Sequence, residues 1–453
     1  MKIIALFLIS NFINIIFSEP IELRGIVEGF YGTPWTFEDR ADLIQFSGKY
    51  KLNAYIYAPK DDSYHREEWR KPYPEDKIKE LQNLITLSKE NNVKFIFAVS
   101  PGNDLNYEGY KGEEDFNILM VKINSIYEIG GRDFAIFFDD ISSTIDSGKN
   151  QANFLNKLYK ELNIRYNDIN SLITVPTEYW RDAMIDGSGN IKQYTKDFST
   201  ILDKNIIVLY TGDGVVCDGI SDENFQKAIE IYNRDLGIWW NYPVNDFLPN
   251  KLALGPIEKL PHKNVKSIFF NPMQQVQLSK IALGTGADYS YFPESYDSNK
   301  SWNNVIEIQY KDIAKEMKIF AMHSTHMENS WAYAGPADAP EFYEEAHQAV
   351  LAIKEQRSFD FSKLLSLIDD MEKSADTLLE KLEENILSEC KLQLIQFKRI
   401  INADRIAVNC LQDGKLDSEL KELRNTITQY ESVAIISEKS AVRFIDEVIE
   451  LFS

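Results

Sequence analysis

The chain contains few cysteines and few histidines for its length of 453 residues. An odd, low cysteine count of three predicts a fold that disulfides do not hold together. We expect Cys390 and Cys410 on one continuous helix, where a rise of about 1.5 Å per residue places them roughly 30 Å apart and excludes a bond between them. None of the five histidines belongs to an H-E-x-x-H pattern, which excludes that class of zinc enzyme.

Several other catalytic patterns are missing. The sequence contains no P-loop, no G-x-S-x-G and no Cys–His motif, which excludes those phosphate-binding loops and nucleophiles. His323 and His326 lie in a Ser- and Thr-containing stretch for which we predict a helix. We expect them to cap that helix or to lie on its surface. Neither a metal nor a cofactor is expected.

Basic residues are scarce relative to acidic ones. Lys and Arg number 49 against 70 Asp and Glu, which gives a net charge of −21. This charge disfavours nucleic acid and anionic membranes as partners, and it makes a polyanion such as hyaluronan an unfavourable ligand. Because 44% of the residues are hydrophobic and 12% are aromatic, the chain can bury a large core and is not a disordered protein.

A long hydrophobic run occurs only at the N-terminus. Residues 1–18 carry an early lysine, an apolar stretch and a small residue before Glu19, which is the pattern of a secretory signal peptide. An uncleaved anchor and a first strand are the alternatives, but the run is short for a bilayer, which needs about 20 residues, and it contains Asn11 and Asn14. We therefore expect a secreted protein without stable membrane insertion.

From residue 19 to 301, short apolar runs alternate with amphipathic segments typical of helices. Eight strands spaced by roughly 30 residues predict an α/β fold, a (β/α)8 TIM barrel. A doubly wound open sheet is the alternative, although no G-x-G-x-x-G follows the first strand. The predicted strands are Leu23–Phe30, Leu52–Ala58, Val93–Val99, Phe134–Phe138, Leu172–Val175, Ile206–Tyr210, Leu236–Trp240 and Ser267–Phe270, and the helices between them include Glu75–Glu90, Phe116–Ile129, Ala152–Leu162 and Asp222–Asn233.

From residue 302 to 453 the pattern changes. Apolar residues at i, i+3, i+4 and i+7 predict a C-terminal all-α helical bundle, and the strand signals stop. Gly414 is expected to end one of its helices. The predicted helical segments are Asn303–Met322, Ala339–Glu355, Phe361–Ile386, Leu387–Leu411 and Lys415–Leu451.

Polar and aromatic residues follow the predicted strands, where barrel enzymes place their chemistry. The most informative are Asp139 and Asp140, directly after the apolar run Phe134–Phe138. Two anions at the exit of a buried strand are costly outside a polar pocket, and their repulsion is expected to raise the pKa of one of them. Aromatic rings among Asp, Asn and Lys suit a sugar. Because the other motifs are missing, carboxylate-based glycoside hydrolysis remains as the reaction class.

The adjacency of the two aspartates bears on mechanism. Ordinary retaining and inverting glycosidases place their two carboxyl groups on either side of the glycosidic bond. Neighbours at one strand end act more easily on one face together. One then protonates the leaving oxygen, while the other orients a group on the substrate. This arrangement favours substrate-assisted hydrolysis, in which a 2-acetamido oxygen is the nucleophile.

Several segments resemble glycoside hydrolase family 84, the β-N-acetylglucosaminidases that include O-GlcNAcases. The resemblance extends from about residue 24 to 300, and the helical part after it is similar to the post-barrel domain of the family. The segments are RGIVEGFYGTPWTFEDR at 24–40, YAPKDD at 57–62, FFDDI at 137–141, PTEYW at 176–180, YTGDGVV at 210–216, WWNYPVND at 239–246, LGP at 254–256 and FNPM at 270–273.

The resemblance implies a role for each matching residue. Asp139 would orient the acetamido N–H, and Asp140 would be general acid and then general base. Tyr179 would hydrogen-bond the acetamido oxygen. The remaining expected substrate contacts are Asn241, Trp239, Thr211 and Val215 around the acetamido group, and Asp246, Lys60, Asn271 and the backbone of Gly29 at the sugar hydroxyls.

The sequence therefore predicts a retaining exo-β-N-acetylglucosaminidase that acts on GlcNAc-bearing glycans or glycoproteins, including O-GlcNAc on Ser or Thr. An endo-acting hydrolase of hyaluronan-type glycosaminoglycans is one alternative, and a non-catalytic glycan-binding barrel is another. If the acetamido group is not the nucleophile, Glu178 and Asp246 are the candidate enzymic nucleophiles.

Overall fold

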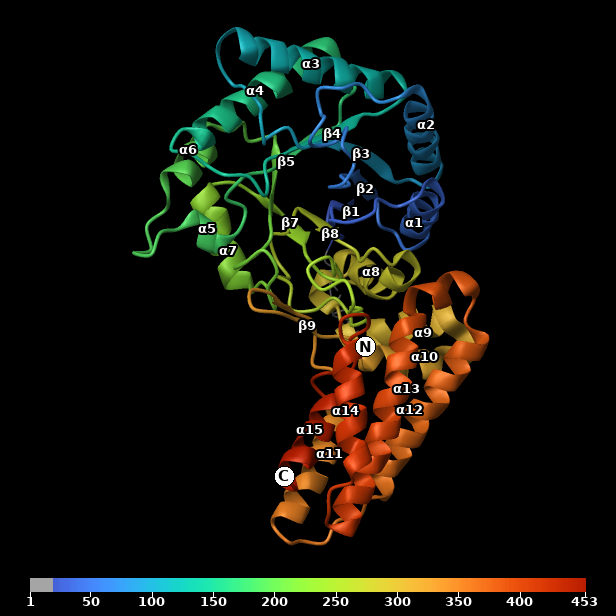
Figure 1. The fold of residues 1–453 in the computed structure, drawn as a ribbon. Coiled ribbons are helices and arrows are strands. Elements are labelled where there is room, and N and C mark those ends of the chain that lie inside the picture. The colour runs from blue at the N-terminus through green and yellow to red at the C-terminus, as the bar shows by residue number, and fades with distance from the viewer. Residues whose placement is uncertain (1–18) are drawn as a thin grey trace, which may run out of the picture.

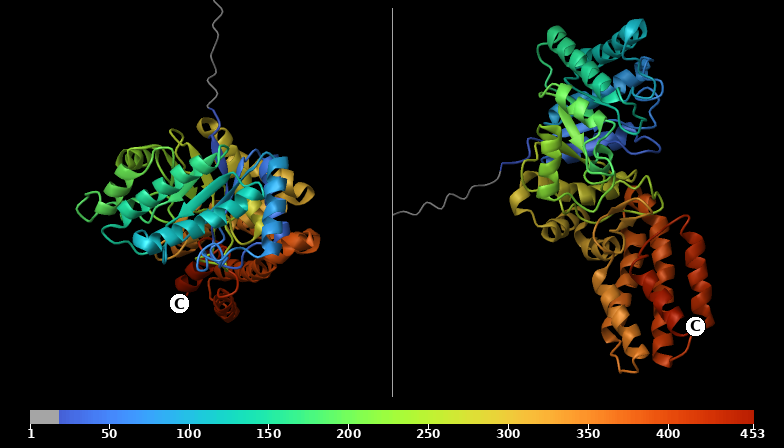
Figure 2. Two further views of the ribbon diagram at one scale, coloured as in Figure 1. Left: turned by 90° about the horizontal axis from the view of Figure 1, so that it is seen from above. Right: turned by 90° about the vertical axis from the view of Figure 1, so that its left-hand side faces the viewer.

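The computed structural model describes residues 19–453, so the predicted signal peptide at 1–18 lies outside the described residues. Figure 1 shows a barrel of strands ringed by helices, from which a bundle of long helices extends. The right-hand view in Figure 2 shows the same elongated arrangement, with the bundle leading away from one side of the barrel. The predicted fold, a (β/α)8 barrel followed by a helical region, is confirmed.

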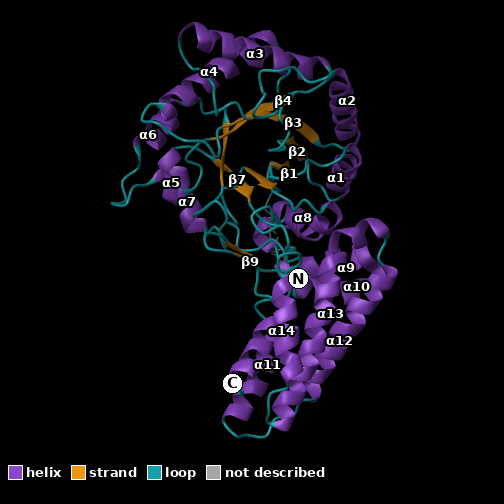
Figure 3. Ribbon diagram, in the orientation of Figure 1, coloured by secondary structure: helices purple, strands orange, loops and turns teal. Residues whose placement is uncertain are grey.

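Eight parallel strands close the barrel in sequence order, at the centre of the ring of helices in Figure 3. β1 pairs with β2 on one side and with β8 on the other, so that Ile26 lies opposite Phe270. This closure excludes the open doubly wound sheet. The strands are β1 (Leu23–Glu28), β2 (Ala54–Tyr57), β3 (Lys94–Val99), β4 (Asp133–Phe137), β5 (Ser171–Val175), β6 (Ile207–Tyr210), β7 (Leu236–Trp240) and β8 (Ser267–Phe270).

Apolar side chains fill the inside of the barrel. Val27, Ile56, Ala98 and Phe269 belong to one buried cluster within the ring of strands. Each Å² of apolar surface removed from water contributes about 25 cal/mol, so this packing stabilises the closed barrel and leaves no channel through it. The space for a ligand lies at the carboxyl ends of the strands.

Helices cover the outside of the barrel except at one connection. Ser221 caps α7 as expected, because its hydroxyl accepts a hydrogen bond from the backbone N–H of Asn224 at 3.1 Å. No helix joins β7 to β8, so the expectation of a helix between every pair of strands is wrong there. The connecting segment, residues 241–266, contains Pro243, Pro249 and Pro256, which do not fit a helix interior. The helices are α1 (Phe37–Lys49), α2 (Glu75–Glu90), α3 (Gly109–Glu128), α4 (Ser147–Arg165), α5 (Arg181–Met184), α6 (Gln193–Ile201), α7 (Asp222–Tyr232) and α8 (Val276–Tyr291).

The C-terminal region is helical, but its boundaries differ from the predicted ones. The segment predicted as Lys415–Leu451 forms two helices separated by residues 431–440, because Ile435 makes a β-bridge to Lys251 of the barrel and Ser437 adopts a left-handed conformation. Gly414 ends α13 in a left-handed conformation, as expected. The helices are α9 (Ser298–Tyr310), α10 (Ala314–Met322), α11 (Pro340–Lys354), α12 (Ser362–Lys381), α13 (Glu384–Asp413), α14 (Ser418–Tyr430) and α15 (Ala441–Leu451).

A short hairpin interrupts the helices after α10. β9 (Met327–Glu328) and β10 (Tyr333–Ala334) pair antiparallel, so the expectation that no strand follows residue 302 is wrong. Two-residue strands are too short to leave a periodic signal. His323 ends α10, but His323 and His326 are both buried, which contradicts the expected surface position.

The three cysteines do not pair. Cys390 and Cys410 both lie on α13, as predicted, and Cys217 is free as well.

Among residues 19–453, no helix is long and apolar enough to cross a membrane.

Candidate active site

A cavity of about 440 Å³ opens at the carboxyl ends of the barrel strands. The structure brings all of the site residues predicted from the sequence to its wall: Gly29, Lys60, Asp139, Asp140, Tyr179, Thr211, Val215, Trp239, Asn241, Asp246 and Asn271. Six further residues complete the lining: Tyr31, Val175, Val216, Val244, Phe247 and Trp331.

Asp139 follows β4 and is buried at the base of the cavity. Its Oδ2 contacts the ammonium group of Lys60, which is buried as well. Its Oδ1 is also buried but accepts no hydrogen bond within residues 19–453. A buried acceptor without a donor is costly, and Asp139 belongs to the cavity wall.

Asp140 is held by two tyrosines. The hydroxyl of Tyr31 donates to Oδ2 at 2.7 Å, and the hydroxyl of Tyr179 donates to Oδ1 at 2.9 Å. The backbone of Asp140 is left-handed, with φ 58°, a conformation that aspartate tolerates better than most residues. The turn from Asp139 to Asp140 therefore places both carboxyl groups on one cavity.

The expected rise in pKa does not occur at Asp140. Burial favours the neutral form, but the positive charge of Lys60 and the hydrogen bonds from Tyr31 and Tyr179 outweigh it and lower the pKa of Asp140 below its usual value. The Lys60 ammonium is 4.0 Å from Oδ2 of Asp140. Because its pKa is lowered, Asp140 is a carboxylate in the ligand-free site. The prediction from the sequence took only the neighbouring aspartate into account and not Lys60, Tyr31 and Tyr179.

A chain of hydrogen bonds through two asparagine side chains joins residues that follow four strands, β1, β6, β7 and β8. Asn271 accepts from the backbone N–H of Gly29 at 3.3 Å and donates to Asn241 at 2.9 Å. Asn241 also accepts from the indole N–H of Trp239 at 2.8 Å and donates to the backbone oxygen of Val215 at 2.8 Å. These bonds fix the position of both asparagine side chains on the cavity wall.

Gly29 has no room for a side chain. A Cβ atom at this position would be 2.3 Å from Cζ2 of Trp239, whose ring is buried. The close approach explains why the wall at this point consists of backbone. Thr211 completes the neighbouring wall and is fixed by donation to the backbone oxygen of Gly214 at 2.9 Å.

Sequence reasoning missed three aromatic residues at the cavity. Tyr31 lies in the EGFYG segment, and its backbone N–H donates to Asp246 at 2.8 Å. Phe247 directly follows Asp246, and Trp331 comes from the turn between β9 and β10. The rings of Phe247 and Trp331 lie 5.2 Å apart between centroids. Tyr31 could have been found from its position at a strand end, whereas no local signal points to Trp331.

Only one of the two candidate enzymic nucleophiles, Glu178 and Asp246, belongs to the cavity wall. Glu178 is buried, and its Oε2 accepts from the hydroxyl of Thr195 on α6 at 2.6 Å. It does not belong to the cavity wall. Asp246 does belong to it, and burial raises the pKa of its carboxyl group.

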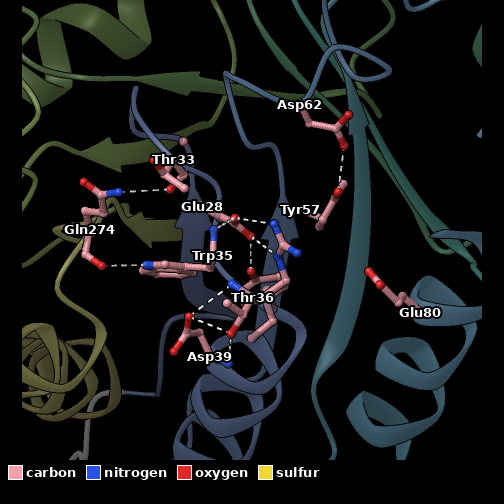
Figure 4. A network of polar contacts seen from close by, with 12 residues as sticks. Glu28, Thr33, Trp35, Thr36, Asp39, Tyr57, Asp62, Glu80 and Gln274 are labelled. Carbon is pink, nitrogen blue, oxygen red and sulfur yellow. Dashed lines mark hydrogen bonds and ion pairs between the residues drawn. The ribbon is translucent and has the colours of Figure 1, made fainter. Parts of the chain in front are cut away.

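A polar network supports the ends of β1 and β2 (Figure 4). Glu28 accepts two hydrogen bonds of 2.8 Å from the guanidinium group of Arg40, and the pair is buried. The hydroxyl of Tyr57 donates to Asp62 at 2.7 Å, two residues after Lys60. Buried charges persist when they are paired in this way. The network therefore fixes the loops that carry Gly29 and Lys60.

The described residues do not gather metal-ligating side chains into a cluster at the cavity. Within the described residues 19–453, no group of three His, Cys, Asp or Glu side chains has the spacing of a metal site. The groups that converge here are carboxylates, amides, aromatic rings and one ammonium.

The fold and the acidic cavity at its strand ends place the chain among the barrel-type glycoside hydrolases, and comparisons with known proteins agree. A family model described as beta-N-acetylglucosaminidase matches residues 24–322, and a model described as hyaluronidase post-catalytic domain-like matches residues 346–445. The chain therefore belongs to the β-N-acetylglucosaminidase family.

Individual relatives lead to the same family. Protein O-GlcNAcase of Rattus norvegicus is 32% identical over 281 residues, and that of Mus musculus is 32% identical over 283 residues. Each match covers 59% of this chain but only 30% of the relative, so the chain spans less than a third of their length.

Solved structures match over a larger part. The structure of CpGH84B has a TM-score of 0.87 and 39% identity, and the match covers 95% of this chain and 77% of that one. A variant of the O-GlcNAc hydrolase of Thermobaculum terrenum has a TM-score of 0.81 and 26% identity, with 95% and 94% covered. The similarity to solved structures thus includes both the barrel and the helical region.

Proposed function

We propose that the protein is a retaining exo-β-N-acetylglucosaminidase that uses the 2-acetamido group of its substrate as the nucleophile. The observation that carries this proposal is the unpartnered Oδ1 of Asp139, beside a carboxylate that two tyrosines hold. An acetamido N–H supplies the donor that Oδ1 lacks. The family membership of the chain supports the same activity.

In the first step, the acetamido oxygen attacks the anomeric carbon while Asp139 accepts the N–H hydrogen bond. The glycosidic bond breaks, and its oxygen takes a proton from Asp140. A protonated oxazoline (an oxazolinium ion) forms, and its N–H stays hydrogen-bonded to Asp139. In the second step, Asp140 removes a proton from a water molecule, which opens the oxazoline with net retention of configuration.

Because the ligand-free site keeps Asp140 ionised, Asp140 must gain a proton before the first step. A sugar that accepts a hydrogen bond from Tyr179 competes for one of the donors that lower the pKa of Asp140. Substrate binding therefore favours the acid form that the reaction needs.

The remaining wall residues bind and orient the sugar. We assign Asn241, Trp239, Thr211 and Val215 to the acetamido pocket, with Tyr179 donating to the acetamido oxygen. The hydroxyl groups of the terminal sugar are assigned to Lys60, Asp246, Asn271 and the backbone of Gly29. The continuous wall that these residues form supports the assignment.

We propose β-linked terminal GlcNAc as the substrate, on glycans or on Ser and Thr of proteins, because the rat and mouse relatives are protein O-GlcNAcases. We also propose secretion, on the basis of the signal-peptide pattern at residues 1–18. Fractionating the expressing cells and sequencing the N-terminus of the protein tests this: protein outside the cell that begins near residue 19 supports secretion, and protein retained inside the cell contradicts it.

Hydrolysis of an aryl β-N-acetylglucosaminide by wild type and Asp140→Asn tests the proposed activity. We expect release of the monosaccharide by wild type and a loss of about 10²–10⁴-fold in kcat for the variant. Release of oligosaccharides from a polymer would instead favour an endo-acting enzyme. Binding of N-acetylglucosamine without turnover would favour a glycan-binding barrel.

A further inference from the structure

The helical bundle supplies a carboxylate to the barrel at α8. This barrel helix starts five residues after Asn271, and its N-cap residue Gln275 makes no side-chain capping bond. Glu389 of α13 takes that role. It accepts from the backbone N–H of Gln277 at 3.0 Å and from that of Leu278 at 2.9 Å. The first N–H groups of a helix need such acceptors, and a negative charge there also interacts favourably with the helix dipole.

The capped turn is directly joined to the cavity wall. The side chain of Gln275 accepts from Nδ2 of Asn245 at 3.0 Å, and Asn245 precedes Asp246. The backbone oxygen of Asn271 accepts from the N–H of Val244 at 2.9 Å. The loop after β7 is thus fixed at two points, to Asn271 itself and to the N-cap residue of α8.

We propose that Glu389 is a positioning residue: by capping α8 from the bundle, it holds the two loops that present Asn271 and Asp246 to the sugar. This inference rests on the proposed function of those two residues. It gives the bundle a role in the barrel site that requires no contact between the bundle helix and the substrate.

Charged and titratable groups from α1, α8 and α9 lie near Glu389. These are Asp39 on α1, Lys280 on α8 and Tyr310 on α9. Lys280 is itself paired with Asp42 of α1 at 2.5 Å. Burial, together with Asp39, raises the pKa of Glu389 to about 7, although the two backbone N–H groups and Lys280 oppose the shift. A protonated carboxyl group keeps one acceptor oxygen and loses its charge, so the cap weakens as the pH falls below about 7.

The test measures KM and kcat of Glu389→Ala and Glu389→Gln at pH 5.5 and 8 with an aryl β-N-acetylglucosaminide. Contacts to sugar hydroxyls act on bound substrate and transition state alike, so their loss raises KM more than it lowers kcat. For Glu389→Ala we expect KM to rise about fivefold at pH 8, with kcat changed less than twofold.

Glu389→Gln imitates the protonated form. Its KM should therefore exceed that of wild type about fivefold at pH 8 and equal it at pH 5.5. The titration of the catalytic aspartates is common to both proteins and cancels in the ratio of the KM of Glu389→Gln to the KM of wild type. A ratio that is the same at both pH values, or an unchanged KM for Glu389→Ala, overturns the inference.

Glu447→Ala is the matched control. Glu447 is a partly buried carboxylate of α15 whose partners Tyr343 and His347 belong to the bundle. The Glu447→Ala variant should have a lower melting temperature than wild type and an unchanged KM. If wild type proves inactive, the proposed function fails. The dissociation constant of N-acetylglucosamine, measured by calorimetry, then replaces KM. Fivefold weaker binding by Glu389→Ala than by wild type supports the positioning role, and equal affinity overturns it.

Discussion

The ammonium group of Lys60 contacts Asp139 and lies 4.0 Å from Oδ2 of Asp140. One cation from the loop after β2 thus faces both carboxylates at the end of β4. Its positive charge offsets the repulsion between the two adjacent carboxyl groups. The same charge opposes the protonation that general acid catalysis requires, so Lys60 adjusts the pH range of the reaction.

Lys60→Met should move the activity toward higher pH. In wild type, the Lys60 charge and the tyrosine hydrogen bonds lower the pKa of Asp140 against the effect of burial. Removing the charge raises this pKa, so Asp140 keeps its proton to a higher pH and the alkaline limb of the kcat/KM profile shifts upward. An alkaline limb that stays in place or moves downward would contradict this role. Lys157→Met, which removes an exposed cation paired with Glu113, should leave the profile unchanged.

Gly29→Ala should damage the site although it adds a single methyl group. The new Cβ would be 2.3 Å from the buried ring of Trp239, and overpacking of this kind typically costs about 1–3 kcal/mol. A displaced Trp239 disturbs Asn241, to which it donates, and we expect kcat/KM to fall at least about tenfold. Gly187→Ala is the control, since its Cβ meets no atom within 4 Å. Equal kinetics for the two variants would show that the close approach at Gly29 is unimportant.

Trp331→Ala should weaken binding of substrates with a large leaving group. Trp331 is 56% exposed at the mouth of the cavity and pairs with Phe247. Loss of one aromatic contact is worth about 0.5–1.5 kcal/mol, so KM for an aryl or peptide glycoside should rise about two- to tenfold, while KM for a methyl glycoside should stay the same. An equal rise for both substrates would place Trp331 at the sugar instead. The exposed Tyr110 on α3 provides a control, and Tyr110→Ala should change neither value.

The sequence was sufficient to predict most of the barrel and its cavity wall for a physical reason. Parallel strands buried on both faces read as short apolar runs, and in a closed barrel the residues after each run meet at one rim. Asp139, Tyr179, Asn241 and Asn271 therefore come together although they are far apart along the chain. The missing helix between β7 and β8 departs from this regular pattern, and the prolines of that segment could have indicated it.

Other features depend on tertiary packing and have no local signal. Trp331 reaches the cavity because a hairpin from the C-terminal region folds back onto the barrel. The direction of the pKa shift of Asp140 depends on Lys60, Tyr31 and Tyr179, which come from three other strand ends. The break after α14 likewise results from a β-bridge between Ile435 and Lys251 rather than from a helix-breaking sequence.

In the proposed mechanism, the acetamido group of the substrate is the nucleophile and Asp139 orients it. The most direct test compares hydrolysis of aryl glycosides whose N-acetyl methyl group carries zero to three fluorine atoms. Fluorine withdraws electrons from the carbonyl oxygen, so kcat/KM should fall with each substitution and by at least about tenfold for the trifluoro compound, a rise of about 1.4 kcal/mol in the barrier. A rate that is independent of fluorination would contradict the account and make Asp246 the candidate enzymic nucleophile.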